Sequence, residues 1–119
     1  MQLPDGIFMT AMPFDDLNIG DAPECPGVYV IYEMGTPVYV GRSRRSIRAR
    51  LLAHRHGRGN WFLKLIGPSP TATFEYCWTL SPEQAEAKLI RALKTKMYGN
   101  YRFETDPAIA YIKNAVRRP

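Results

Sequence analysis

The stretch that decides the fold is "GVYVIYEMGTPVYVG", residues 27–41. Two runs within it, 28–32 and 37–40, are rich in β-branched and aromatic residues, which is typical of β-strands. The Glu-Met-Gly between them suits a three-residue hairpin loop whose glycine takes the left-handed conformation. This loop length predicts that Tyr29 and Tyr39 lie opposite each other on one face of the hairpin.

A helix is predicted directly after the hairpin. Ser46 can cap it, and it runs from Ile47 to about His56, where Gly57 ends it. At about 100° per residue, Arg50 falls at the edge of the face that packs against the sheet. The residues predicted to form that face are Ile47, Leu51 and His54.

The second half of the chain predicts a third strand over residues 71–80 and a helix from Pro82 to Met97, capped by Ser81. The inward side of the strand is Ala72, Phe74, Tyr76 and Trp78, or the opposite register. The apolar stripe of the helix is Leu89, Ile90, Leu93 and Met97. Residues 60–67 are expected to form a short buried helix or turn, and residues 106–118 a last amphipathic helix.

Glu86 is anomalous because its carboxylate falls close to the centre of that apolar stripe. A buried carboxylate is costly unless it meets a cation, a metal or hydrogen-bond donors. One interpretation is an ion pair with a nearby arginine. The other is a site for a hard cation such as Mg²⁺, which a single carboxylate can hold together with water and substrate phosphate.

The charge is distributed unevenly along the chain. Residues 1–41 contain six acids and no Lys or Arg, whereas residues 42–119 contain all 16 basic residues and five acids, a net charge of +11. No acid lies between Glu33 and Glu75, so the arginines in this interval favour a polyanionic partner over a merely solvated face. Those expected to contact nucleic acid are Arg42, Arg44, Arg45, Arg48, Arg55 and Arg58.

The length of 119 residues predicts one domain, which we divide into an acidic leader, residues 1–25, and a domain of residues 26–119. The leader is expected to pack loosely or to add a short edge element. No apolar run approaches the roughly 20 residues that a membrane span needs. Cys25 and Cys77 have no closely spaced partner, which argues against a zinc site and favours thiols in a cytoplasmic protein.

Several of these motifs together resemble the GIY-YIG nuclease superfamily. Gly27-Val28-Tyr29 and Tyr39-Val40-Gly41 are similar to its two hallmark triplets, with Val for Ile in each. The family's helix residues fall on Ile47, Arg50 and His54, its metal-binding Glu on Glu86 and its Asn on Asn100. The loop before the helix is one residue longer than in some members, so Arg48 competes with Arg50, although the spacing from Ile47 favours Arg50. The interval from Glu86 to Asn100 is also longer than the common form.

The resemblance implies an α+β fold, in which helices flank a small three-stranded antiparallel sheet, and it implies a metal-dependent endonuclease that hydrolyses DNA. Tyr39 would be the general base for water, helped by His54 and Tyr29, although the two tyrosines could exchange roles. Arg50 would stabilise the phosphate charge, and Glu86 would hold Mg²⁺ or Mn²⁺. Gly41 would let the backbone turn out of the strand near the phosphate.

Two other functions stay open on the sequence. The chain could be a catalytically silent nucleic-acid-binding module, or an interaction protein that uses its basic face. Because so little of the chain lies outside the matched residues 26–101, a nuclease of this size would need a protein partner or a homodimer for sequence specificity.

Overall fold

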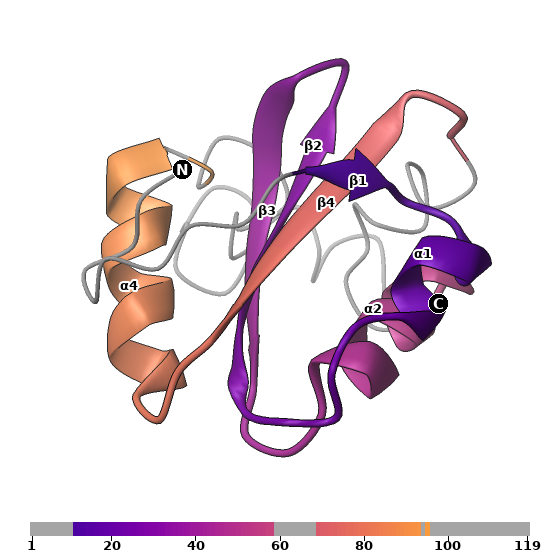
Figure 1. Cartoon of the computed structure of the whole chain (residues 1–119). Helices are drawn as coiled ribbons and strands as arrows, with labels where there is room; N and C mark the ends of the chain where they lie inside the picture. The colour runs from indigo at the N-terminus through magenta and orange to yellow at the C-terminus, as the bar shows by residue number, and fades with distance from the viewer. Residues whose placement is uncertain (1–10, 59–68, 94, 96–119) are drawn as a thin grey trace, which may run out of the picture.

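The computed structural model describes residues 11–58, 69–93 and 95, and shows one antiparallel sheet with helices on both faces (Figure 1). The strands lie in the order β1-β4-β2-β3. Their bounds are Met12–Pro13 for β1, Gly27–Glu33 for β2, Thr36–Ser43 for β3 and Ala72–Trp78 for β4. The helices are α1, Asp16–Gly20; α2, Ile47–Arg55; and α4, Pro82–Leu93. The predicted α+β class is confirmed, but the sheet has four strands rather than three.

The fourth strand comes from the acidic N-terminal segment. Met12 pairs with Phe74 of β4, and Asp15 caps α1 by accepting a hydrogen bond from the backbone N–H of Asn18 at 2.9 Å. Phe14, Ile19 and Ala22 are buried in the core. Loose packing was therefore the wrong alternative for this part of the leader, and the short edge element was the right one. The boundary at residue 25 stays a prediction.

The hairpin between β2 and β3 has a different register from the predicted one. Glu33 pairs with Thr36 across a two-residue turn, in which Met34 and Gly35 have φ of 52° and 81°. Positive φ at both central residues gives the turn a twist that matches the strands. A register shift next to Ile31 then places Tyr29 opposite Gly41, not opposite Tyr39.

The sheet buries both of its faces. Helices α1 and α2 cover one face, and α4 covers the other (Figure 1). Strand β4 contributes Phe74 to the core under α2 and Cys77 to the core under α4. Side chains on both faces of this strand are therefore buried, and the two predicted inward sides are both correct in part. Trp78, expected on one inward side, is about half exposed at 47%.

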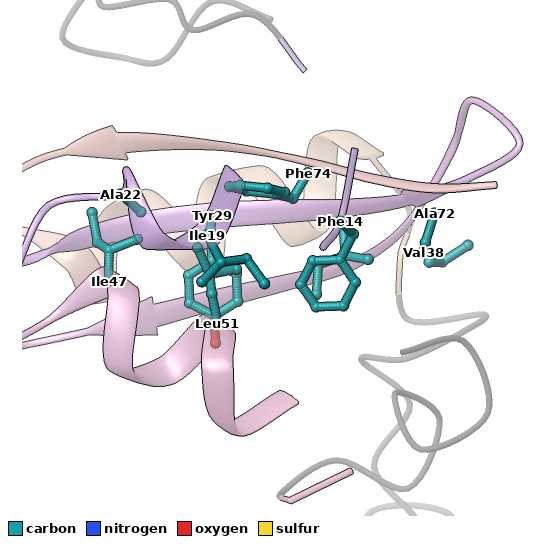
Figure 2. Close-up of a cluster of buried hydrophobic side chains, with 10 residues drawn as sticks. Phe14, Ile19, Ala22, Tyr29, Val38, Ile47, Leu51, Ala72 and Phe74 are labelled. Atoms are coloured by element: carbon teal, nitrogen blue, oxygen red, sulfur yellow. The ribbon is translucent and has the colours of Figure 1, made fainter. Parts of the chain in front are cut away.

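The core under α2 surrounds Tyr29 (Figure 2). Ile47 and Leu51 of α2 pack there together with Ile19 of α1, as the helical periodicity predicts for α2. Ser46 accepts a hydrogen bond from the N–H of Ala49 at 3.1 Å and so caps α2 as expected.

Helix α4 begins at Pro82 as predicted, and it buries Ala85 and Leu89 against the sheet. None of the helices in the described part of the chain is long and apolar enough to cross a membrane. The predictions for residues 60–67, Met97, Asn100 and 106–118 lie outside the described residues.

Candidate active site

Three aromatic side chains meet on the α2 face of the sheet. Tyr29 comes from the central strand β2, Tyr39 from the edge strand β3, and His54 from the last turn of α2. Nε2 of His54 and the hydroxyl of Tyr29 are hydrogen-bonded at 2.7 Å. The ring centroid of Tyr39 lies 6.3 Å from that of Tyr29 and 5.3 Å from that of His54. The two tyrosines therefore converge as diagonal neighbours on one face, although they do not pair across the strands.

Gly41 makes room for the Tyr29 ring. A Cβ atom at position 41 would overlap the far end of that ring, including its hydroxyl. Strand β3 continues through Gly41 to Ser43, so the expectation that Gly41 turns the backbone out of the strand is wrong. The second triplet therefore needs a glycine at position 41, because the ring of Tyr29 from the first triplet lies against it. Gly27 has a similar part, since a Cβ there would overlap Ile47 and the carbonyl of Cys77.

Burial fixes the protonation states of the cluster. It lowers the pKa of His54 to about 4, with the positive charge of Arg50 as a second cause. It raises the pKa of Tyr29, which Tyr39 beside it raises further, and it also raises the pKa of Tyr39. At neutral pH the folded protein therefore holds a neutral imidazole against two protonated phenols.

The buried His54 makes stability depend on pH. Its folded pKa lies below the 6.5 of an ordinary histidine, so the unfolded chain binds the proton first as the pH falls. Stability should fall as the pH decreases from about 6.5 towards 4, and by roughly 2 kcal/mol between pH 7 and pH 5. Urea unfolding of the wild type and of His54→Gln at these two pH values measures this loss, which the variant should lack.

His56→Gln is the matched control, because His56 follows the same helix but is exposed. This variant should keep the loss of stability between pH 7 and pH 5. An equal loss in His54→Gln would mean that His54 is not the group responsible.

Arg50 rather than Arg48 belongs to this cluster. The positive charge of Arg50 acts on Tyr29, Tyr39 and His54. Arg48 instead donates to the carbonyl of Ala22 at 2.8 Å and lies 3.5 Å from the carboxylate of Glu24. The structure therefore brings Arg50, and not Arg48, to the aromatic cluster, and the catalytic role of Arg50 stays a prediction.

Glu86 approaches the site from the other face of the sheet. The Nη1 of Arg42 lies 2.5 Å from its Oε1, so the ion-pair interpretation of Glu86 is realised in the structure. The Glu86 side chain is 12% exposed, and its charge is among the causes that raise the pKa of Tyr29 and of Tyr39, after burial. Because β3 is the edge strand, a carboxylate on α4 can act on the tyrosines around that edge.

The residues around Glu86 fit a hard divalent cation better than a transition metal. No group of three or more His, Cys, Asp or Glu side chains in the described part of the chain could hold a metal by itself. A single carboxylate is nonetheless sufficient for Mg²⁺, which keeps most of its water and takes further ligands from phosphate.

Comparison with solved structures finds crystal structures of the GIY-YIG N-terminal endonuclease domain of UvrC from Thermotoga maritima. The magnesium-bound domain is 29% identical at a TM-score of 0.55, over 67% of this chain and 90% of that domain. Its Asn-to-Ala variant, bound to its catalytic divalent cation, is also 29% identical at a TM-score of 0.56, over 67% of this chain and 89% of that one. The chain has a GIY-YIG-like fold. No family model matches it, and no curated protein matches it.

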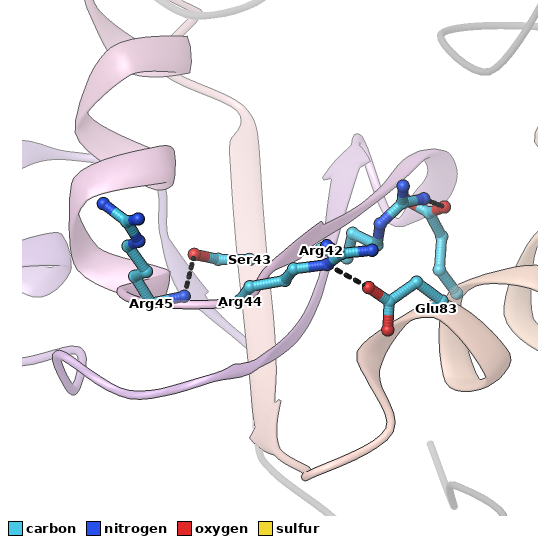
Figure 3. Close-up of polar contacts among 6 residues, drawn as sticks. Arg42, Ser43, Arg44, Arg45 and Glu83 are labelled. Atoms are coloured by element: carbon cyan, nitrogen blue, oxygen red, sulfur yellow. Dashed lines mark hydrogen bonds and ion pairs between the residues drawn. The ribbon is translucent and has the colours of Figure 1, made fainter.

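The GIY-YIG hairpin leads directly into the arginine-rich segment (Figure 3). Arg44 forms an ion pair with Glu83 of α4, beside the pair of Arg42 with Glu86. The side chain of Arg45 lies on the α2 side and is exposed, while its backbone N–H donates to Oγ of Ser43 at 3.2 Å.

The sequence reasoning allowed an ion pair at Glu86 but did not identify Arg42 as its partner, and it missed the pair of Arg44 with Glu83. Alternation along β3 could have placed Arg42 on the opposite face from Tyr39 and Gly41, towards α4. The other two arginines expected to bind nucleic acid follow from α2, with Arg55 in its last turn and Arg58 exposed just beyond it. Asn100 lies outside the described residues of this GIY-YIG chain.

Proposed function

We propose that the protein is a metal-dependent endonuclease that hydrolyses the phosphodiester bonds of DNA. The convergence of Tyr29, Tyr39, His54 and Arg50 on one face, with Glu86 around the adjacent sheet edge, carries this proposal. The similarity to a magnesium-bound endonuclease domain supports it.

Neutral His54 is the proton acceptor of the proposed reaction, and because burial lowers its pKa to about 4, it would hold the proton only transiently. With the proton on Nδ1, its Nε2 accepts the hydrogen bond from Tyr29. Burial makes a free phenolate unfavourable at either tyrosine, so Tyr39 would take a proton from water only while its own proton passes to Tyr29 and that of Tyr29 passes to His54. The relay ends with hydroxide on the phosphorus side and an imidazolium at His54.

Arg50 and Glu86 would act on the phosphate. The Arg50 guanidinium stabilises negative charge that passes through the tyrosines, and it would neutralise the non-bridging oxygens as their charge increases. Glu86 would hold Mg²⁺ or Mn²⁺, and the cation would supply a Lewis acid for the leaving oxygen.

The arginines around the site would hold the DNA backbone. Arg45 and Arg58 are exposed on the α2 side and past its end, where a phosphate could reach them, and Arg42, Arg44, Arg48 and Arg55 are the further candidates. Arginine suits phosphate because its planar fork of donors matches two oxygens. A protein partner or a second copy would add sequence specificity, and we propose that the enzyme acts in the cytoplasm.

Plasmid cleavage tests the proposal. Supercoiled DNA incubated with the protein and Mg²⁺ should become nicked and then linear, and excess EDTA should stop this completely. Linear and branched DNA tested in parallel would indicate which structure is preferred. DNA binding without cleavage under any divalent ion would instead identify a silent binding module, and absence of both would leave only an interaction protein.

A further inference from the structure

Two ion pairs join β3 to α4, and they differ in burial. Arg44 and Glu83 keep 76% and 40% of their side-chain surface exposed, whereas Arg42 and Glu86 keep 39% and 12%. A partly buried pair is stronger than an exposed one because water screens it less, and its carboxylate is more costly to leave without a cation. Glu86 therefore depends on Arg42 far more than Glu83 depends on Arg44.

The same carboxylate is the proposed metal ligand. Nη1 of Arg42 lies 2.5 Å from Oε1 of Glu86, so its guanidinium charge would repel a metal ion that bound the same carboxylate. Arg42 is also more exposed than Glu86, so it can leave the pair without unfolding its strand. Its neighbour in β3, Gly41, lies against the Tyr29 ring, so the backbone of Arg42 is one residue away from the site.

We infer that Arg42 is a displaceable counter-ion, which neutralises Glu86 in the metal-free protein and moves to a substrate phosphate when the metal binds. This inference rests on the proposed function. It makes metal and DNA binding mutually reinforcing, since the metal releases Arg42 for the phosphate and the phosphate draws Arg42 away from Glu86. By linkage, each ligand must then raise the affinity for the other by the same factor.

Mn²⁺ affinity tests the inference without any readout of cleavage. Free Mn²⁺ is titrated by electron paramagnetic resonance against the full chain, carrying Tyr39→Phe so that no DNA is cut, with and without a short duplex. Without DNA, Arg42→Gln should bind Mn²⁺ about tenfold more tightly, a coupling within the usual range. With the duplex, the gain in Mn²⁺ affinity should be smaller in Arg42→Gln than in its parent.

Arg44→Gln is the matched control, because it removes the neighbouring charge and the neighbouring ion pair to the same helix. It should change Mn²⁺ affinity by less than about twofold, in keeping with its exposed, screened position. A variant with a damaged fold would bind Mn²⁺ more weakly. Tighter Mn²⁺ binding by Arg42→Gln therefore cannot be explained by damage to the fold.

Two outcomes overturn the inference, and they can be told apart. If Mn²⁺ binds the parent and is lost in Glu86→Gln, but Arg42→Gln binds no more tightly than Arg44→Gln, then the metal site is right and the counter-ion is wrong. If Mn²⁺ binding is the same with and without Glu86→Gln, then the metal site of the proposed function fails and the inference fails with it.

Discussion

Replacing Glu86 with alanine is expected to lower DNA cleavage by a factor of at least about a hundred while leaving DNA binding intact. Removal of a group that stabilises transition-state charge typically costs roughly 10² to 10³ in rate. Cleavage of supercoiled plasmid measures the rate, and fluorescence anisotropy with a labelled duplex measures binding. Binding should be preserved or strengthened, because the loss of Glu86 frees Arg42 from its ion pair.

Glu83→Ala is the control for this variant. Glu83 lies one turn earlier on α4 and pairs with Arg44, so the control removes an equivalent carboxylate and ion pair without touching the proposed metal ligand. Cleavage by Glu83→Ala should stay within a few-fold of the wild type. Normal metal-dependent cleavage by Glu86→Ala would rule out Glu86 as the metal ligand.

Arg50→Ala and Tyr39→Phe should each lower cleavage by at least about a hundredfold, the first by loss of charge stabilisation and the second by loss of the proton path. Arg50 acts on all three aromatic residues of the site, whereas Arg48 binds the Ala22 carbonyl and Glu24. Single-turnover cleavage rates at saturating protein separate the chemical step from DNA affinity.

Arg48→Ala serves as the control, since it removes the same charge two residues away on the same helix. Its single-turnover rate should fall only a few-fold, with a modest loss of stability from the lost contact to Ala22. A larger fall at Arg48 than at Arg50 would assign the family arginine to Arg48, contrary to the geometry.

Local sequence signals predicted most of the fold. Strand content, helix periodicity and the Ser46 cap depend on neighbouring residues, so β2, β3, α2 and the start of α4 lie where they were expected. The predicted hairpin register was wrong because the turn has two residues instead of three and because the pairing is irregular next to Ile31. Both features depend on the twist and packing of the whole sheet. The predicted pairing of Tyr29 with Tyr39 was wrong, but the shift kept both on one face, so they are diagonal neighbours.

The sequence predicted those residues of the candidate site that belong to one motif or to one helix. Tyr29, Tyr39, Arg50 and His54 were found this way, and the structure brings them together. The pairs of Arg42 and Arg44 with α4 join residues about 40 positions apart, so nearness in sequence could not identify the partners.

The burial of Phe14 and Ile19 also escaped the sequence reasoning. A five-residue helix shows too little periodicity to be recognised, and the surrounding acids suggested a solvated segment. Only the tertiary fold shows that two apolar side chains of this segment fill the core beside α2.

The close fit of Gly41 beneath Tyr29 has a consequence for how this protein could change by mutation. A side chain at position 41 and the full tyrosine ring at position 29 exclude each other, and such overpacking typically costs about 1–3 kcal/mol. A larger residue at 41 becomes acceptable only after position 29 has shrunk, which removes the hydroxyl that His54 binds. Position 41 therefore depends on position 29, and a library that randomises position 41 alone, with Tyr29 kept, can recover little besides glycine.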